Sequence, residues 1–308
     1  MAVAEHTPAL LKQVLEGLAP RPGGVIIDAT VGLGGHAAAI LETPGVRLIG
    51  LDVDPEALGI ARERLASFGD RVTLLRQSYW ELAEIAAGLH LREVDGVLLD
   101  LGVSSLQLDT PARGFSFRHD APLDMRFAAE GPTAADWLAR VTEEELVRTL
   151  RDFGEEPRAR RVARAVLRSR ELAPIESTGQ LRRIVASALG HSGRIDPATR
   201  TFQAIRIAVN QELSGLPGTL EQAARLLGPG GRLAVIAFHS LEDRIVKQSF
   251  KRLAGRCVCP PGTFPCRCAP ESLLEILTKK PLEAQAAEVA ANPRARSAKL
   301  RLAARRPE

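Results

Sequence analysis

The stretch Asp28-Ala29-Thr30-Val31-Gly32-Leu33-Gly34-Gly35-His36 decides the fold. It follows the apolar run 25–27 and leads into an alanine-rich segment typical of a helix. A second apolar run, 48–51, ends at Asp52, 20 residues after Gly32. A strand, a glycine turn, a helix, a second strand and a final carboxylate are the layout of a nucleoside-binding α/β unit. The glycines allow close backbone approach to a ligand, and Asp52 is placed to accept hydrogen bonds from the ribose hydroxyls.

Two nucleoside ligands are compatible with this turn. Gly32, Gly34 and Ala37 also match the dinucleotide pattern G-x-G-x-x-G/A, so NAD and S-adenosylmethionine are both candidates. Asp28 favours S-adenosylmethionine, because a carboxylate there repels a pyrophosphate but attracts the α-ammonium group of the ligand. An ordinary glycine-rich turn without a ligand is the third interpretation. We predict binding through Gly32, Gly34, Gly35, His36 and Asp52.

The alternation of apolar runs and helical periodicity continues after Asp52. It predicts a helix over 55–67, a strand over 71–75 followed by Tyr79, a helix over 80–89 and a strand over 94–100 that ends in Asp100. Such alternation is typical of a parallel, doubly wound sheet, whose ligands lie outside the carboxyl ends of the strands. Asp28, Asp52, Tyr79 and Asp100 all fall at these ends.

The alternation stops between residues 106 and 211. This segment contains loops and helical periodicity over 143–153, 158–170 and 179–189, and it contains no good strand pattern. Strand and helix signals return afterwards, with a turn at 228–231, a strand over 232–238 and a further helix. We therefore predict a discontinuous α/β domain, Rossmann-like, at 1–105 and 212–308, interrupted by an α-helical insertion at 106–211. The tail from Asn292 reads as short and basic.

Arginine is concentrated within the insertion. The chain has a formal net charge of +4, but the eleven arginines and three acids of segment 157–210 give that segment +8. Guanidinium groups match phosphate oxygens in geometry, so the cluster favours a nucleic-acid partner. A solvated face of an arginine-rich, thermostable protein is the alternative.

Two further side chains are candidates for chemistry. Asp100 leaves its strand beside the expected position of a transferred methyl group, and a carboxylate there can accept a hydrogen bond from an attacking amine. A turn-capping role is the alternative. His239 ends the strand over 232–238 and can handle a proton or touch the substrate, whereas Ser240 with Asp243 reads as a helix cap.

All four cysteines lie in one Pro/Gly-rich loop, as Cys257-x-Cys259 and Cys266-x-Cys268. Four thiolates can hold a tetrahedral zinc ion, although the usual spacing is C-x2-C. Zinc binding, disulfides and reduced thiols all remain open, and we assign no metal ligand to the active site.

The composition is that of a soluble globular protein, with 45% hydrophobic and 25% charged residues. Residues 1–8 lack the basic and apolar regions of a secretory signal, and no apolar run is long enough to span a bilayer. We expect a cytoplasmic protein that does not enter membranes. The oligomeric state is not predicted.

Several longer segments resemble the MraW family of ribosomal RNA small subunit methyltransferases, and the similarity covers essentially the whole chain. They are 30–36, 98–105, 107–109, 113–117, 122–126, 197–204, 238–244 and 292–297. The resemblance implies a Rossmann-like S-adenosylmethionine-dependent methyltransferase domain with a helical insertion. It also implies N4-methylation of a cytidine in the decoding region of 16S ribosomal RNA, with the small ribosomal subunit as the partner.

Carried over by position, the resemblance implies that the cofactor is contacted by Gly34, Gly35, His36, Asp52, Tyr79, Asp100 and Gln107. Tyr79 stands where the family commonly has phenylalanine, and its ring can still stack on adenine. The cysteine loop is not general to the family. An NAD-dependent oxidoreductase and a non-enzymatic ribosome-assembly factor are the rival functions. The first lacks a catalytic Tyr-x3-Lys, since Tyr79 is the only tyrosine, and the second leaves a complete cofactor site unexplained.

Overall fold

The computed structural model describes residues 8–190 and 196–307, and the chain folds as two compact units. One unit consists of Met1–Gly102 and Leu213–Glu308 and contains the sheet. The other, Val103–Glu212, is built mainly from helices. The sequence-based boundaries of the insertion, 106 and 211, lie close to these limits. Residues 1–7 of the N-terminal segment considered as a signal, and Arg194 of the arginine cluster, lie outside the described residues.

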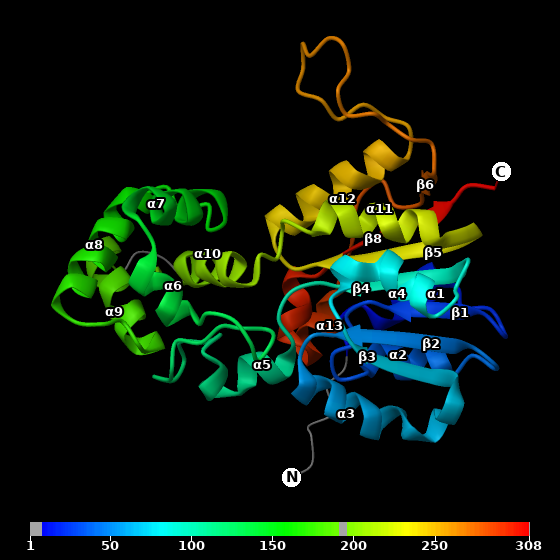
Figure 1. The fold of residues 1–308 in the computed structure, drawn as a ribbon, viewed down its shortest axis with the longest axis horizontal. Coiled ribbons are helices and arrows are strands. Elements are labelled where there is room, and N and C mark those ends of the chain that lie inside the picture. Colours follow the sequence, from blue (N-terminus) through cyan, green and yellow to red (C-terminus); the bar gives the residue numbers. More distant parts are fainter. Residues whose placement is uncertain (1–7, 191–195, 308) are drawn as a thin grey trace. The chain divides into compact units, whose positions relative to one another are not determined.

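The first unit is an eight-stranded sheet with helices on both faces (Figure 1). Its strands are β1 (Val25–Asp28), β2 (Arg47–Asp52), β3 (Val72–Arg76), β4 (Val94–Asp100), β5 (Leu227–Ala237), β6 (Leu274–Ile276), β7 (Leu282–Glu283) and β8 (Lys299–Arg305). Its helices are α1 (Leu11–Leu18), α2 (Gly35–Leu41), α3 (Pro55–Leu65), α4 (Leu82–Gly88), α11 (Leu216–Leu226), α12 (Ser240–Leu253) and α13 (Ala286–Ala291). The predicted α/β class is confirmed.

The strand order is β3-β2-β1-β4-β5-β8-β6, with β7 also paired to β8. The neighbours from β3 to β5 are parallel, as predicted. The order reverses between β1 and β4, and ligands of doubly wound sheets bind outside the carboxyl ends of the strands at such a point. The topology therefore places the candidate site at the ends of β1, β2 and β4.

The central strands β1, β2 and β4 carry mainly apolar side chains between their ends because both faces of the sheet are covered there. Successive residues of β1 point to opposite sides, so that Ile26 and Ile27 belong to two separate hydrophobic clusters. Helices α1, α2 and α3 supply side chains to the cluster around Ile26, and α4, α11 and α12 supply them to the cluster around Ile27. The carboxyl ends of the strands thus start from a rigid, doubly packed layer.

The predicted parallel sheet is mixed at one edge. Strand β8 runs antiparallel to β5, and β6 and β7 run antiparallel to β8. The basic tail therefore forms a buried strand, because Leu300 and Leu302 pack into the core while Arg301 pairs with Asp243 of α12. Strand β5 also begins earlier than predicted, at Leu227. Leu227 pairs with Val94, and the pairing resumes between Arg232 and Gly96 after an irregularity that contains the turn 228–231.

The second unit has its own hydrophobic core, formed by buried residues of its longer helices. These elements are α5 (Ser105–Asp109), α6 (Ala134–Arg140), α7 (Glu143–Asp152), α8 (Ala159–Leu172), α9 (Thr178–Leu189) and α10 (Thr199–Asn210). The sequence patterns predicted α7, α8 and α9 to within two residues at each end. Ser177 and Gln180 form a capping box that starts α9, and three consecutive glutamates in the first turn of α7 complement the helix dipole.

Candidate active site

Side chains from five parallel strands meet the carboxyl edge of the sheet. Asp28, Asp52 and Asp100 are the last residues of β1, β2 and β4. Tyr79 follows β3, and His239 follows β5. The topology therefore brings together the strand-end residues that the sequence singled out, including Asp100 and His239, which are 139 positions apart.

The turn between β1 and α2 is open on the side of Gly32. Gly32 and Gly34 have φ angles of +50° and +77°, a left-handed conformation that favours glycine. A Cβ added at Gly32 would find only the Thr30 carbonyl oxygen within 4 Å, at 3.8 Å, whereas one at Gly34 would press on Leu65 at 3.3 Å. A Cβ at Gly35 would lie 2.5 Å from Pro8. Gly32 thus leaves room for a ligand, and the other two glycines allow close packing.

Asp52 joins this turn to the end of β2. Its Oδ2 accepts a hydrogen bond from the Gly32 N–H at 2.9 Å, and its Oδ1 accepts one from the Asp54 N–H at 2.9 Å. Burial raises the pKa of Asp52 from 3.8 to about 6, although these two backbone donors favour the ionised form. Each oxygen keeps acceptor capacity, so an ionised Asp52 can receive the two hydroxyls of a ribose.

Asp28 is more deeply buried than a residue that lines an open site. The residue is 1% exposed, and its Oδ1 accepts a hydrogen bond from the Thr30 N–H at 3.2 Å. Burial raises its pKa to about 7, while the neighbouring His36 imidazole acts in the opposite direction. A contact of Asp28 with the ammonium group of a ligand remains a prediction.

His36 and Asp100 form the polar centre of the site. His36 Nε2 lies 3.4 Å from Asp100 Oδ2, and the His36 side chain is 6% exposed. The backbone N–H of Asp100 donates to Thr30 Oγ1 at 2.6 Å, which holds the end of β4 against the glycine turn. Thr30 was visible in the sequence only as part of the glycine motif, and its contact with Asp100 could not be predicted.

Three buried atoms of this centre have no hydrogen-bond partner in the described part of the chain. They are both ring nitrogens of His36 and Oδ1 of Asp100. Buried polar atoms are usually satisfied, and unpaired ones cost free energy. Their presence at a strand edge beside an open glycine turn is therefore the expected sign of a polar ligand or substrate group.

His239 begins α12 as its N-cap, a role that the sequence analysis assigned to Ser240 with Asp243. His239 Nδ1 accepts a hydrogen bond from the Glu242 N–H at 3.4 Å. The Glu242 carboxylate in turn accepts from the N–H of Phe238 at 2.8 Å and of His239 at 3.3 Å. Asp243 cannot serve the cap because its carboxylate is bound by Arg301. Glu242, which is 2% exposed, was missed, although an acid three residues after a cap is a known signal.

The remaining two predicted residues have defined local positions. Tyr79 is half-buried and packs against the cluster around Ile27, and its carbonyl oxygen accepts a hydrogen bond from Thr219 Oγ1 at 3.3 Å. Gln107 belongs to the helical unit, where its side chain accepts from the Ser104 N–H at 3.0 Å and completes the capping box of α5. A contact of either residue with the cofactor remains a prediction.

The arrangement fits S-adenosylmethionine. An open glycine turn, a carboxylate on the neighbouring strand, an aromatic ring on the next strand and a polar centre at the switch point supply the donors and acceptors that its parts require. The fold and site define the class as an α/β methyltransferase that uses S-adenosylmethionine.

The chain belongs to the MraW methylase family, whose sequence model matches residues 3–306. Three curated relatives carry the name ribosomal RNA small subunit methyltransferase H. The protein of Symbiobacterium thermophilum is 55% identical over 96% of this chain and 95% of its own length. Those of Heliobacterium modesticaldum and Geobacter sulfurreducens are 52% and 53% identical, over 98% and 97% of this chain and 98% of each relative. The family resemblance and the enzymatic activity are confirmed, and the oxidoreductase and non-enzymatic alternatives are set aside.

None of the helices in the described residues combines the length and the apolar character that crossing a membrane requires.

Proposed function

We propose that this methyltransferase acts on the RNA of the small ribosomal subunit and methylates N4 of a cytidine in the decoding region of 16S ribosomal RNA. The printed names of its relatives support a small-subunit ribosomal RNA as the substrate. The choice of cytidine N4 rests on the family resemblance and on Asp100, whose unpaired Oδ1 carries the proposal. Because its substrate is ribosomal, we place the enzyme in the cytoplasm.

Cofactor binding is assigned to the glycine turn and the strands beside it. The backbone at Gly32, Gly34 and Gly35 runs beneath the ligand, and Asp52 accepts the ribose hydroxyls. The Tyr79 ring lies against adenine and provides apolar contact area. When bound, S-adenosylmethionine supplies a methyl group on a positively charged sulfur, which makes that carbon electrophilic.

Asp100 directs the nucleophile. The exocyclic amine of cytosine is a weak nucleophile because its lone pair is delocalised into the ring. Oδ1 of Asp100 accepts a hydrogen bond from the N4–H, which favours a tetrahedral nitrogen with a localised lone pair. The amine would take up the methyl group that the bound cofactor supplies, and the Asp100 carboxylate would accept the proton that N4 releases. His36, 3.4 Å from the other oxygen of Asp100, holds the carboxylate in place.

His239 and Gln107 are assigned supporting roles. With Nδ1 accepting from Glu242, a neutral His239 ring carries its proton on Nε2, a buried atom 3.1 Å from Glu242 Oε1. We assign His239 to substrate positioning at the end of β5. Gln107 lies in the first helix of the helical unit, α5, and is assigned to cofactor binding by family position.

The helical unit is proposed to recognise RNA, and its structure separates structural arginines from available ones. Arg170 donates to the Leu138 and Val141 carbonyl oxygens at 2.7 and 2.9 Å. Arg206 forms a bidentate pair with Glu212 at 2.8 and 2.9 Å. Arginines such as these stabilise the fold. Fewer positive charges than the +8 of segment 157–210 are therefore available to bind phosphates.

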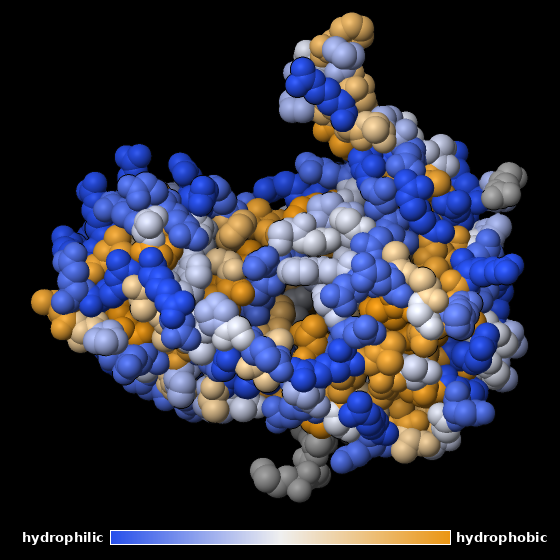
Figure 2. Space-filling view, in the orientation of Figure 1, coloured by the Kyte–Doolittle hydropathy of each residue, from blue (hydrophilic) through white to orange (hydrophobic). Residues whose placement is uncertain are grey.

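Within segment 157–210, four of the described arginines are exposed and form no ion pair: Arg160, Arg161, Arg168 and Arg200. Arg160 and Arg168 are two helical turns apart on α8 and therefore lie on one face, with Arg164 between them. Figure 2 shows largely hydrophilic side chains along the edge of this unit that carries α7 and α8. This face suits the phosphate backbone of RNA. The target cytosine must be unpaired or flipped out, since N4 is inaccessible inside a stem.

The test is methyl transfer from labelled S-adenosylmethionine to small subunits lacking the modification and to naked 16S RNA, followed by nucleoside analysis. We expect a single labelled product, N4-methylcytidine. Label on another base, or on the ribose, would overturn the assignment of Asp100 as the partner of an exocyclic amine. No label in either small subunits or naked 16S RNA, from protein that still binds S-adenosylmethionine, would overturn the proposed substrate.

A further inference from the structure

All four cysteines lie in the loop that connects α12 to β6, in a part of the sheet unit that the methyltransferase chemistry does not use. In Figure 1 this loop projects beyond the end of α12, and Figure 2 shows it surrounded by solvent on both sides. Helix α12 begins directly after His239 and ends at Leu253, so its 14 residues place the loop about 20 Å from the strand edge.

The base of the loop is closed by backbone hydrogen bonds. The Glu271 N–H donates to the Arg252 carbonyl oxygen at 2.9 Å, and the Leu273 N–H donates to the Leu253 carbonyl oxygen at 2.8 Å. Beyond this base, residues 255–270 include no buried side chain. A loop without a hydrophobic core has nothing to offset the entropy of ordering its backbone, unless a covalent or metal link holds it.

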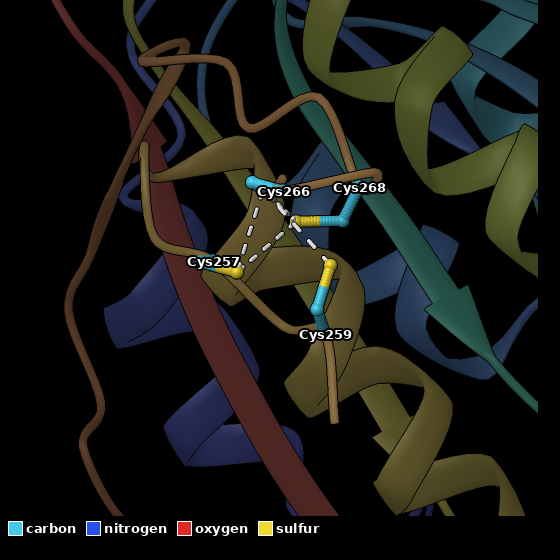
Figure 3. A group of neighbouring side chains, drawn as sticks. All are labelled: Cys257, Cys259, Cys266 and Cys268. Carbon is cyan, nitrogen blue, oxygen red and sulfur yellow. Dashed lines mark hydrogen bonds between the residues drawn. The ribbon is translucent and has the colours of Figure 1, made fainter. Parts of the chain in front are cut away.

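The four thiol groups nevertheless converge on one point (Figure 3). The Sγ atom of Cys266 lies 3.4 Å from that of Cys268, 3.5 Å from that of Cys257 and 3.9 Å from that of Cys259. Cys268 and Cys257 are 3.7 Å apart, and all four sulfur atoms lie within 4.8 Å of one another. Both C-x-C pairs therefore reach the same centre, despite the unusual spacing.

These distances match a metal centre better than disulfides. A disulfide requires about 2.0 Å between sulfur atoms, and the cysteines are free in the structure. Four sulfur atoms at the corners of a tetrahedron around zinc, each about 2.3 Å from the ion, are about 3.8 Å apart. The sulfur positions thus already outline the corners of a tetrathiolate site.

The surroundings of the sulfur atoms also suit thiolates. The Val258 N–H donates to Cys268 Sγ at 3.3 Å, and the Arg267 N–H donates to Cys259 Sγ at 3.4 Å. In each case the N–H group and the sulfur atom that accepts its hydrogen bond belong to opposite segments of the loop. Donors of this kind orient and stabilise metal-bound sulfur. Arg256 and Arg267, next to cysteines in the chain, offset the net charge of −2 that four thiolates and Zn²⁺ carry.

We propose that Cys257, Cys259, Cys266 and Cys268 bind one zinc ion and that the ion holds this loop in its folded form. Four protein ligands leave no position for water or substrate, so the site is structural. It acts independently of the methyl-transfer centre, from which α12 separates it. The ion takes the place of a hydrophobic core in the exposed loop.

The first measurement is the metal content of the full-length chain purified in reducing buffer without chelator. We expect about one zinc ion per chain and four thiols that become reactive only when the zinc is displaced by a mercurial reagent. Protein that carries no zinc and takes up none when Zn²⁺ is added under reducing conditions would overturn the proposal. So would iron as the bound metal, or thiols consumed in disulfides that reduction does not convert into a zinc site.

Variants then locate the ion. Cys266→Ser combined with Cys268→Ser removes two ligands and is expected to abolish zinc binding, whereas Phe264→Ala changes an exposed side chain of the same loop and retains it. The metal-free protein reloaded with Co²⁺ should show the visible absorption of a tetrahedral tetrathiolate site, and the double variant should not. Zinc retained in full by the double variant would contradict the assignment. S-adenosylmethionine affinity should be the same in all three proteins.

Discussion

The neighbours of Asp100 fix its position but leave part of its hydrogen-bonding capacity unused. Its backbone is tied to Thr30, and one carboxylate oxygen lies near His36, while the other is buried without a partner in the described residues. An acceptor prepared in this way loses little free energy of reorganisation when the substrate amine arrives. The proposed reaction therefore depends on this carboxylate more than on any other side chain.

Replacing Asp100 with Asn should reduce methyl transfer by about 100-fold or more, because an amide is a weaker acceptor and cannot take the proton. Single-turnover assays with labelled S-adenosylmethionine measure the effect. Asp70→Asn, an exposed residue after α3, is the matched control. Affinity for the cofactor should change much less than the rate. A variant with the wild-type rate would remove Asp100 from the chemistry.

Asp52 predicts a pH dependence of cofactor binding. Its pKa in the free enzyme is raised to about 6, so the carboxyl group is protonated below that pH and loses acceptor capacity for the hydroxyls. Affinity should therefore rise as the pH increases through about 6, and it should be roughly tenfold weaker at pH 5 than at pH 8. Calorimetric titrations across this range test the slope. Asp52→Asn should bind weakly and lose this part of the pH dependence, which separates it from the titration of Asp28.

At the scale of elements, α12 and β8 are joined by one buried ion pair. Arg301 Nε donates to Asp243 Oδ1 at 2.6 Å, and its Nη2 donates to Oδ2 at 3.0 Å, with the two side chains 7% and 16% exposed. Strand β8 lies between β5 and β6, so this pair secures the antiparallel edge of the sheet to the helix that His239 begins.

Asp243→Ala should lower the free energy of unfolding by about 3 kcal/mol, because it leaves the Arg301 guanidinium buried without a counter-ion. Urea denaturation of the full chain measures the difference. Asp152→Ala is the control, since Asp152 forms an exposed pair with Arg151 at 3.5 Å and should cost less than about 1 kcal/mol. Equal effects of the two substitutions would mean that burial of the Asp243 pair is unimportant for stability.

At the scale of the whole molecule, the proposed methyl transfer and the proposed RNA recognition belong to different units of the chain. The sheet unit carries the strand-end residues, and the helical unit carries the unpaired arginines of α8. Binding that depends on phosphate contacts weakens with salt, by a slope set by the number of contacts. The arginine face is therefore testable apart from the reaction.

Arg160→Ala with Arg168→Ala should weaken RNA binding and reduce the slope of log affinity against log salt concentration by about 1.5, as two phosphate contacts are lost. Filter binding of 16S RNA over a range of salt concentrations gives the slope. A variant with Arg62→Ala and Arg92→Ala changes the net charge equally from exposed positions of the sheet unit. If both variants shift the slope alike, the α8 face has no special part in binding.

Much of the site was predictable because strand ends can be read from a linear pattern. Apolar runs that end in Asp28, Asp52 and Asp100 predict buried parallel strands, and the carboxyl ends of such strands share one edge. The tail could not be read in the same way. Lys299, Arg301 and Arg305 suggest a solvated segment, and only the carboxylate of Asp243, more than fifty positions away, makes burial of Arg301 possible.

The sequence by itself determined the α/β class, the helical insertion, the methyltransferase family and most candidate site residues, because these depend on local periodicity and on spacing along the chain. Only the tertiary structure decided which polar groups find partners. It buried Asp28, made His239 the cap of α12, separated structural arginines from free ones and brought four sulfur atoms to one point. Hydrogen bonds, ion pairs and metal geometry join residues that are distant in sequence, so they are decided when the chain is folded.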